Sequence, residues 1–120
     1  MAKIVIIDDD KSILEVTKII LEAENYKVEM IDSDRNIIEK VKKIMPDLIL
    51  LDISMPGLGG KEICTKLKKE TETEKIPIMM LSASSKIREV TKDCGADYWL
   101  EKPFEMDQLI DKVKQVLNRL

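Results

Sequence analysis

The feature that most constrains the fold is a repeated alternation of short apolar runs with helical patterns. Four apolar runs and a weaker fifth, the second in chain order, lie at Lys3 to Ile7, Val28 to Ile31, Leu48 to Leu51, Ile78 to Leu81 and Tyr98 to Leu100. Short apolar runs bounded by polar residues are typical of parallel strands that are buried on both faces of a sheet. We therefore predict five strands.

Between these runs, apolar residues recur at the three- and four-residue spacing of an amphipathic helix. The first such pattern contains Ile13, Val16, Thr17, Ile20 and Leu21, and the last runs from Met106 to Leu120. Shorter patterns lie at residues 37–44, 63–67 and 87–94. A strand followed by a helix, five times over, predicts right-handed crossovers onto one parallel sheet with helices on both faces. The expected fold class is an α/β doubly wound domain.

Chain length and composition fit one domain over residues 1–120. A chain of 120 residues, 44% hydrophobic and 36% charged, can bury a core of its own. The Pro- and Gly-rich segment at residues 56–60 is too short for a linker. No apolar stretch reaches membrane-spanning length and no signal region is visible, so we expect no membrane contact and a cytoplasmic protein.

Composition also excludes several kinds of chemistry. The chain has no histidine, which excludes Ser-His-Asp hydrolysis and histidine metal sites. The net charge is −3 and the basic residues form no stripe, so we expect no direct binding of nucleic acid. Cys64 and Cys94 lie outside any CxxC spacing, at apolar positions of expected helices, and we predict core packing for both rather than a redox or metal role.

Polar residues collect where the predicted strands end. Asp8 and Asp9 follow the first run, Asp52 the third and Ser82 the fourth, and Lys102 lies just beyond the fifth. Ligands of open parallel sheets bind beyond the carboxyl ends of the strands, so these side chains are expected at one crevice.

The residue types predict the chemistry of that crevice. Three converging carboxylates repel one another unless a cation neutralises them, and Mg²⁺ suits a site with few protein oxygens. Lys102 adds a positive charge that could pair with Asp52 and then with a phosphoryl oxygen, and Ser82 adds a hydroxyl donor. This set favours transfer of a phosphoryl group onto Asp52 as the nucleophile.

Four fragments at the strand ends carry a family resemblance. The segments IVIIDDD, LILLDISMPGLGG, IMMLSA and GADYWLEKPF closely resemble the receiver domains of bacterial response regulators, over essentially the whole chain. The resemblance implies a flavodoxin-like sheet in the order 2-1-3-4-5. It also implies that Asp52 accepts a phosphoryl group from a sensor histidine kinase or a histidine phosphotransfer protein. Beyond self-phosphorylation and slow self-dephosphorylation at Asp52, the chain is not expected to be an enzyme.

The resemblance also implies a role for each residue at the metal. Asp9 and Asp52 would bind Mg²⁺ directly, and Asp8 would act through bound water. Ser54, two residues after Asp52, would contribute its backbone carbonyl oxygen.

The resemblance also implies roles in the conformational switch that follows phosphorylation. Ser82 matches the switch position, whose hydroxyl turns toward the phosphoryl group. Lys102 matches the lysine of the family's Lys-Pro pair, whose bond to Pro103 is expected to be cis. Trp99 occupies the aromatic switch position, which usually holds Tyr or Phe, and Tyr98 should face the other side of the strand. In the family this aromatic side chain moves inward when the switch hydroxyl moves. Because an indole is bulkier than the ring of Tyr or Phe and carries an N–H donor, the inward rotation of Trp99 is a separate hypothesis.

The expected partners follow from the same resemblance. The kinase would dock near Ile13 to Thr17, beside the crevice. A downstream protein or output domain would read the surface formed by Ile87 to Cys94, Trp99 and Met106 to Val113. Phosphorylation-dependent dimerisation through that surface is common among similar domains.

Two other functions are compatible with parts of the pattern. One is a constitutive receiver-like adaptor, although none of the acidic pair, the acceptor and the lysine is missing here. The other is an aspartate-based phosphohydrolase, but that class requires Asp-x-Asp, and here Asp52 is followed by Ile53 and Ser54. For Asp8 and Asp9, capping of the following helix is the simpler alternative, and for Asp10 it is the favoured reading.

Overall fold

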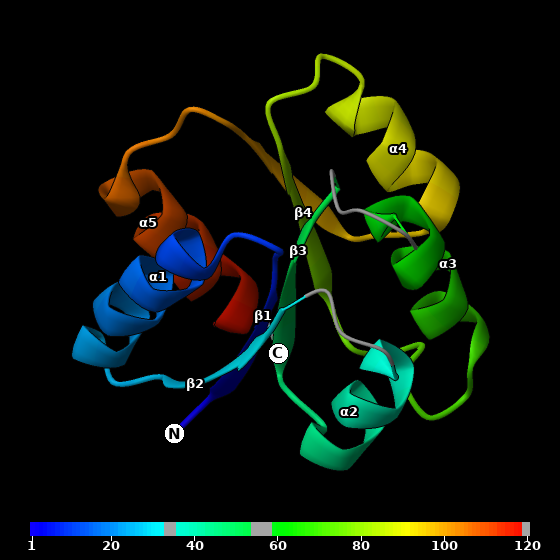
Figure 1. Cartoon of the computed structure of the whole chain (residues 1–120), viewed down its shortest axis with the longest axis horizontal. Coiled ribbons are helices and arrows are strands. Elements are labelled where there is room, and N and C mark those ends of the chain that lie inside the picture. The colour runs from blue at the N-terminus through cyan, green and yellow to red at the C-terminus, as the bar shows by residue number, and fades with distance from the viewer. Residues whose placement is uncertain (33–35, 54–58, 119–120) are drawn as a thin grey trace.

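The computed structural model describes residues 1–32, 36–53 and 59–118. Strand and helix alternate five times along the chain (Figure 1). In order, the elements are β1 (Lys3–Ile7), α1 (Lys11–Ala23), β2 (Lys27–Ile31), α2 (Ile37–Ile44), β3 (Leu48–Asp52), α3 (Gly60–Lys69), β4 (Ile78–Ser82), α4 (Ile87–Cys94), β5 (Tyr98–Glu101) and α5 (Met106–Leu117).

The five strands form one parallel sheet in the order β2-β1-β3-β4-β5. Helices α1 and α5 cover one face, and α2, α3 and α4 cover the other (Figure 1). The predicted fold class and strand order are therefore confirmed. Among the residues that the structure describes, no helix is both long and apolar enough to cross a membrane.

The central strands explain why the sequence shows continuous apolar runs. Every residue of β3 and β4 is buried, because alternate side chains enter the two cores on opposite faces of the sheet. In β3, Leu48 and Leu50 pack toward α1 and α5, whereas Ile49 and Leu51 pack toward α2, α3 and α4. The strand continues one residue beyond the predicted run, since Asp52 still pairs with Leu81 in β4.

The predicted inward face of α1 is wrong in part. Leu14, Thr17 and Leu21 are buried, whereas Ile13 is 38% exposed and Val16 is 48% exposed. Apolar residues cover more than one stripe of this helix, so the three- and four-residue spacing fits two faces that differ by one position. Burial against the sheet selects the face centred on Leu14 and leaves apolar side chains at the surface.

Candidate functional site

Three carboxylates meet at the carboxyl ends of the central strands. Asp8 and Asp9 follow β1, and Asp52 is the last residue of β3, which lies next to β1 in the sheet. Each offers one carboxylate oxygen, and these oxygens all lie within 4.8 Å of one another. Asp8 and Asp52 are buried, at 2% and 7% exposure, whereas Asp9 is exposed. The expected convergence of these residues is thus observed, and the donor set suits a hard divalent cation such as Mg²⁺.

Asp8 has the most perturbed electrostatics of the cluster. The pKa of Asp8 is raised from an ordinary 3.8 to about 6, mainly by burial and also by the neighbouring Asp52 and Asp9 side chains. The Asp10 N–H, which donates to Asp8 Oδ1 at 3.0 Å, and the charge of Lys102 partly offset this effect. Ionisation of Asp8 therefore has a free-energy cost, which a bound cation would offset.

Lys102 lies beside both buried carboxylates. Its Nζ is 3.6 Å from Asp52 Oδ1 and 3.8 Å from Asp8 Oδ2. The lysine directly follows β5, and its backbone N–H donates to the carbonyl oxygen of Ser82 at 2.8 Å. The bond from Lys102 to Pro103 is cis, as expected. The side chain is 26% exposed, so it can reach both the carboxylates and an incoming anion.

Ser82 ends β4 at the same edge of the sheet and is only 2% exposed. Its Oγ accepts a hydrogen bond from the backbone N–H of Ser84 at 3.0 Å. A hydroxyl that accepts in this way still has its own hydrogen to donate. Ser82 therefore combines a turn role with a hydroxyl that can also act as a donor.

Trp99 lies on the α4 side of β5 and is 38% exposed. The guanidinium carbon of Arg88 in α4 lies 5.4 Å from the centroid of the indole ring, a cation–π contact. Tyr98 packs against the opposite core, beside α5, which confirms that the two aromatic residues face opposite sides. Sequence reasoning missed Arg88, because nothing in the spacing of residues 88 and 99 signals a contact between a helix and the following strand.

Asp10 is the N-cap of α1 and Gly60 is the first residue of α3, so both begin helices that follow the strands carrying the carboxylates. Asp10 accepts hydrogen bonds from the N–H groups of Ser12 and Ile13, so the predicted capping role is confirmed. Gly60, the first residue of α3, is packed so closely that an added Cβ would lie 2.7 Å from Ile53 Cα and closer still to the Asp52 carbonyl oxygen. Ser54, the predicted carbonyl ligand, lies outside the described residues.

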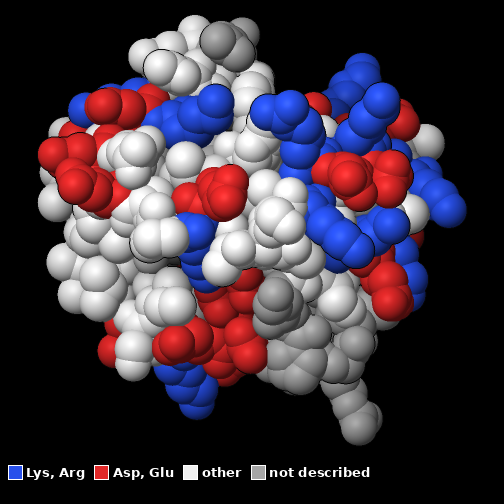
Figure 2. Space-filling model, turned by 90° about the horizontal axis from the view of Figure 1, so that it is seen from above, with Lys and Arg blue, Asp and Glu red and all other residues white. Residues whose placement is uncertain are grey.

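Seen from above the carboxyl ends of the strands, acidic side chains gather near the centre of the molecule, and many basic side chains gather at the side of α3 and α4 (Figure 2). Two hollows flank the acidic cluster. One, of about 420 Å³, is mainly apolar and includes Asp8, Lys102, Phe104 and Met106 in its lining.

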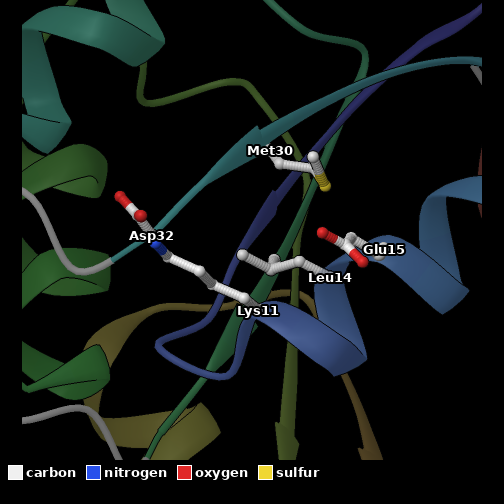
Figure 3. Close-up of a pocket in the computed structure, with 5 residues that line it drawn as sticks. All are labelled: Lys11, Leu14, Glu15, Met30 and Asp32. Atoms are coloured by element: carbon white, nitrogen blue, oxygen red, sulfur yellow. The ribbon is translucent and has the colours of Figure 1, made fainter.

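The other hollow, of about 230 Å³, lies between α1 and β2 (Figure 3). Lys11, Leu14 and Glu15 of α1 line it together with Met30 and Asp32, and Lys11 extends toward Asp32 (Figure 3). Its mixed charges complement no single class of ligand, and we assign it no chemistry.

The fold and the site together define a class of protein. A doubly wound parallel sheet with buried carboxylates and a lysine at its carboxyl edge is equipped to hold a cation together with an anionic group. The chain matches the response regulator receiver domain over residues 4–114 and belongs to that family, the receiver part of two-component signalling systems.

Similar proteins include two transcriptional regulators. The DNA-binding dual master transcriptional regulator RpaA of Synechocystis sp. is 35% identical over 122 aligned positions, covering 99% of this chain and 50% of that protein. The phosphate regulon transcriptional regulatory protein PhoB of Rhizobium meliloti is 33% identical, covering 99% of this chain and 53% of that protein. The chain thus spans about half the length of these relatives.

Solved structures of the same fold match over nearly their full length. The chemotaxis protein CheY4 of Vibrio cholerae superposes with a TM-score of 0.89 at 31% identity, covering 98% of this chain and 99% of that one. A CheY-like receiver domain protein of Methanospirillum hungatei gives a TM-score of 0.89 at 30% identity, covering 99% of this chain and 95% of that one.

Proposed function

We propose that this receiver domain accepts a phosphoryl group on Asp52, in a reaction that requires Mg²⁺, and thereby changes the surface it offers to a downstream partner. The observation that carries the proposal is the cluster of Asp8, Asp9 and Asp52 with Lys102 at 3.6 Å from the acceptor carboxylate. Membership of the receiver family supports the same reading.

Each residue has a task that follows from its chemistry. Asp9, Asp52 and the backbone carbonyl of Ser54 would bind Mg²⁺ directly, and Asp8 would act through water. The ion, when bound, neutralises charge on the carboxylates and on the transferred phosphoryl group. An Asp52 oxygen attacks phosphorus, the bond from phosphorus to the donor histidine nitrogen breaks, and the neutral imidazole leaves.

Lys102 and Ser82 would stabilise the product. The ammonium group of Lys102 exchanges its pairing with Asp52 for a phosphoryl oxygen, and the Ser82 hydroxyl donates to another phosphoryl oxygen. A shift at the end of β4 then changes the surface made by α4, β5 and α5, including Trp99. We propose that a downstream protein or output domain reads this surface, directly or through dimerisation, and that the domain itself does not contact nucleic acid.

The phosphoryl donor has a candidate docking surface beside the site. Ile13 and Val16 of α1 and Met106 of α5 are exposed apolar side chains. They line a hollow of about 230 Å³ beside α1, and Ile13 and Met106 also line the larger hollow that reaches Asp8 and Lys102. We infer that the helix presenting the phosphohistidine of a kinase or phosphotransfer protein packs here, because it must reach Asp52.

The first test is the intact mass of the protein after incubation with acetyl phosphate, with and without Mg²⁺. We expect a magnesium-dependent gain of one phosphoryl group, which base removes and which Asp52→Asn abolishes. The matched control is Asp111→Asn, an exposed carboxylate on α5, which should be modified like the wild type. Modification that persists in Asp52→Asn, or no modification at all, would refute the proposal and favour a constitutive adaptor.

A second test separates docking from chemistry. Val16→Asp should slow transfer from a phosphorylated histidine phosphotransfer domain at least about tenfold, since a buried charge at such an interface is unfavourable, while leaving the reaction with acetyl phosphate unchanged. Met45→Asp, at an equally exposed apolar residue after α2, is the control. Equal transfer rates for both variants would show that the partner docks elsewhere.

A further inference from the structure

The only two cysteines of the chain lie in contact, although thirty positions separate them. Cys64 lies in α3, and Cys94 is the last residue of α4, the helix that packs beside α3 on the same face of the sheet (Figure 1). The Cys64 thiol donates to the carbonyl oxygen of Cys94 at 3.5 Å. Core packing of both residues, at 0% and 3% exposure, is confirmed, but their contact is a separate finding.

The two thiols differ in acidity. The proximity of the two side chains is the largest influence on both, and it lowers the pKa of Cys94 to about 7 while it raises that of Cys64. Nearby backbone N–H groups also favour the Cys94 thiolate. Because the thiolate is the nucleophilic form of cysteine, Cys94 is the member of the pair that attacks an oxidant, and Cys64 is the member that keeps its proton.

We propose that Cys64 and Cys94 form a reversible disulfide bond in the presence of hydrogen peroxide, and that this bond ties α3 to α4. The Cys94 thiolate attacks one peroxide oxygen, the O–O bond breaks, and protonation of the leaving oxygen gives water and a Cys94 sulfenic acid. The Cys64 sulfur then attacks the Cys94 sulfur, and the displaced hydroxide takes the Cys64 proton to form a second water. Two thiols are oxidised and one peroxide is reduced.

Access to the pair requires only a local opening. Cys94 ends α4, and the next residue is the exposed Gly95, whose φ of 83° terminates the helix. Helix ends open at lower free energy than helix centres, so a small oxidant can reach Cys94 without unfolding of α3. The same freedom lets the Cys94 sulfur approach the Cys64 sulfur to the bonding distance of about 2.05 Å.

The bond would constrain an element that the proposed switch uses. Helix α4 also carries Arg88, which contacts Trp99, so a covalent tie at its carboxyl end would restrict the surface of α4 and β5. This consequence rests on the proposed function, whereas formation of the bond does not.

The test treats the folded, reduced protein with a few equivalents of hydrogen peroxide and measures its intact mass without reductant. We expect a monomer that has lost two hydrogens, a tryptic peptide that joins α3 to α4, and full recovery of both thiols with a phosphine reductant. Circular dichroism before and after oxidation checks that the chain remains folded.

Cys64→Ala and Cys94→Ala serve as matched controls, and neither should lose two hydrogens. If a variant fails to fold, the cross-linked peptide from the wild type decides alone. An unchanged mass, addition of oxygen atoms as the final product, or a disulfide between two chains would each overturn the proposal.

Discussion

The charge on Asp8 should destabilise the metal-free protein at neutral pH. Its pKa is about 6 in the folded protein and 3.8 ordinarily. Between these values the folded state binds more protons than the unfolded state, so the free energy of unfolding falls as pH rises through this window. At about 1.4 kcal/mol per pH unit, the full effect is about 3 kcal/mol, reached above about pH 7.

Asp8→Asn isolates this effect, because the amide oxygen can still accept the Asp10 N–H while the charge is gone. In EDTA at about pH 7.5, we expect the variant to be up to about 3 kcal/mol more stable than the wild type. At about pH 4 the difference in stability should shrink to under about 1 kcal/mol, because the Asp8 side chain is then protonated in the folded wild type and nearly half protonated in the unfolded chain. Urea unfolding followed by circular dichroism at both pH values measures the gap.

Two comparisons make the test specific. Asp111→Asn removes an exposed carboxylate and should change stability by less than about 0.5 kcal/mol at either pH. Saturating Mg²⁺ should stabilise the wild type at neutral pH and narrow its difference in stability from Asp8→Asn, since an ion held by the proposed site would bind the folded state and not the unfolded chain. A gap of the same size at both pH values, or a variant that is less stable at neutral pH, would refute the assignment of an energetic cost to the Asp8 charge.

Three further predictions concern contacts around the site. Gly60→Ala should cost about 1–3 kcal/mol in urea unfolding, because the new methyl group meets backbone atoms, whereas Gly59→Ala, where the nearest atom is 4.0 Å away, should cost less than about 1 kcal/mol. The Asp97 carboxylate accepts hydrogen bonds from the Ile78 N–H of β4 at 2.9 Å and from Lys68 of α3 at 2.8 Å. We expect Asp97→Asn to lower the free energy of unfolding by about 1–2 kcal/mol. The exposed Asp93→Asn should lower it by less than about 0.5 kcal/mol. Arg88→Ala should increase acrylamide quenching of the chain's one tryptophan, and unchanged quenching would mean that the cation–π contact does not shield the indole.

The sequence predicted the sheet and the position of its polar edge because both follow from local pattern and topology. Strands buried on two faces appear as apolar runs, and a residue that ends such a run must lie at the carboxyl edge of a parallel sheet. Asp8, Asp52 and Lys102 were accessible to this reasoning for that reason. The distance of 3.6 Å from Lys102 Nζ to Asp52 Oδ1 agrees with this expectation that they lie at one edge of the sheet.

Features that depend on contacts between elements were not predictable in this way. The inward face of α1 was misassigned because Ile13 and Val16 share the helical spacing of the buried residues, and only packing against the sheet distinguishes them. The contacts of Arg88 with Trp99 and of Cys64 with Cys94 join α4 to a strand and to another helix. No periodicity records such pairs, because their spacing is set by how the elements pack.

The energetics of Asp8 link the stability of the fold to the chemistry of the site. A carboxylate that is 2% exposed beside Asp52 is held in an unfavourable charged state, and Lys102 at 3.8 Å offsets only part of the cost. A divalent cation bound at the proposed site would remove that cost, and the electrostatic free energy released would add to its affinity. If Asp8 were replaced by a neutral residue, the apo protein would gain stability and the site would lose affinity for the ion. We therefore expect opposite signs for the two effects in Asp8→Asn, which calorimetric titration with Mg²⁺ and urea unfolding can measure on one preparation.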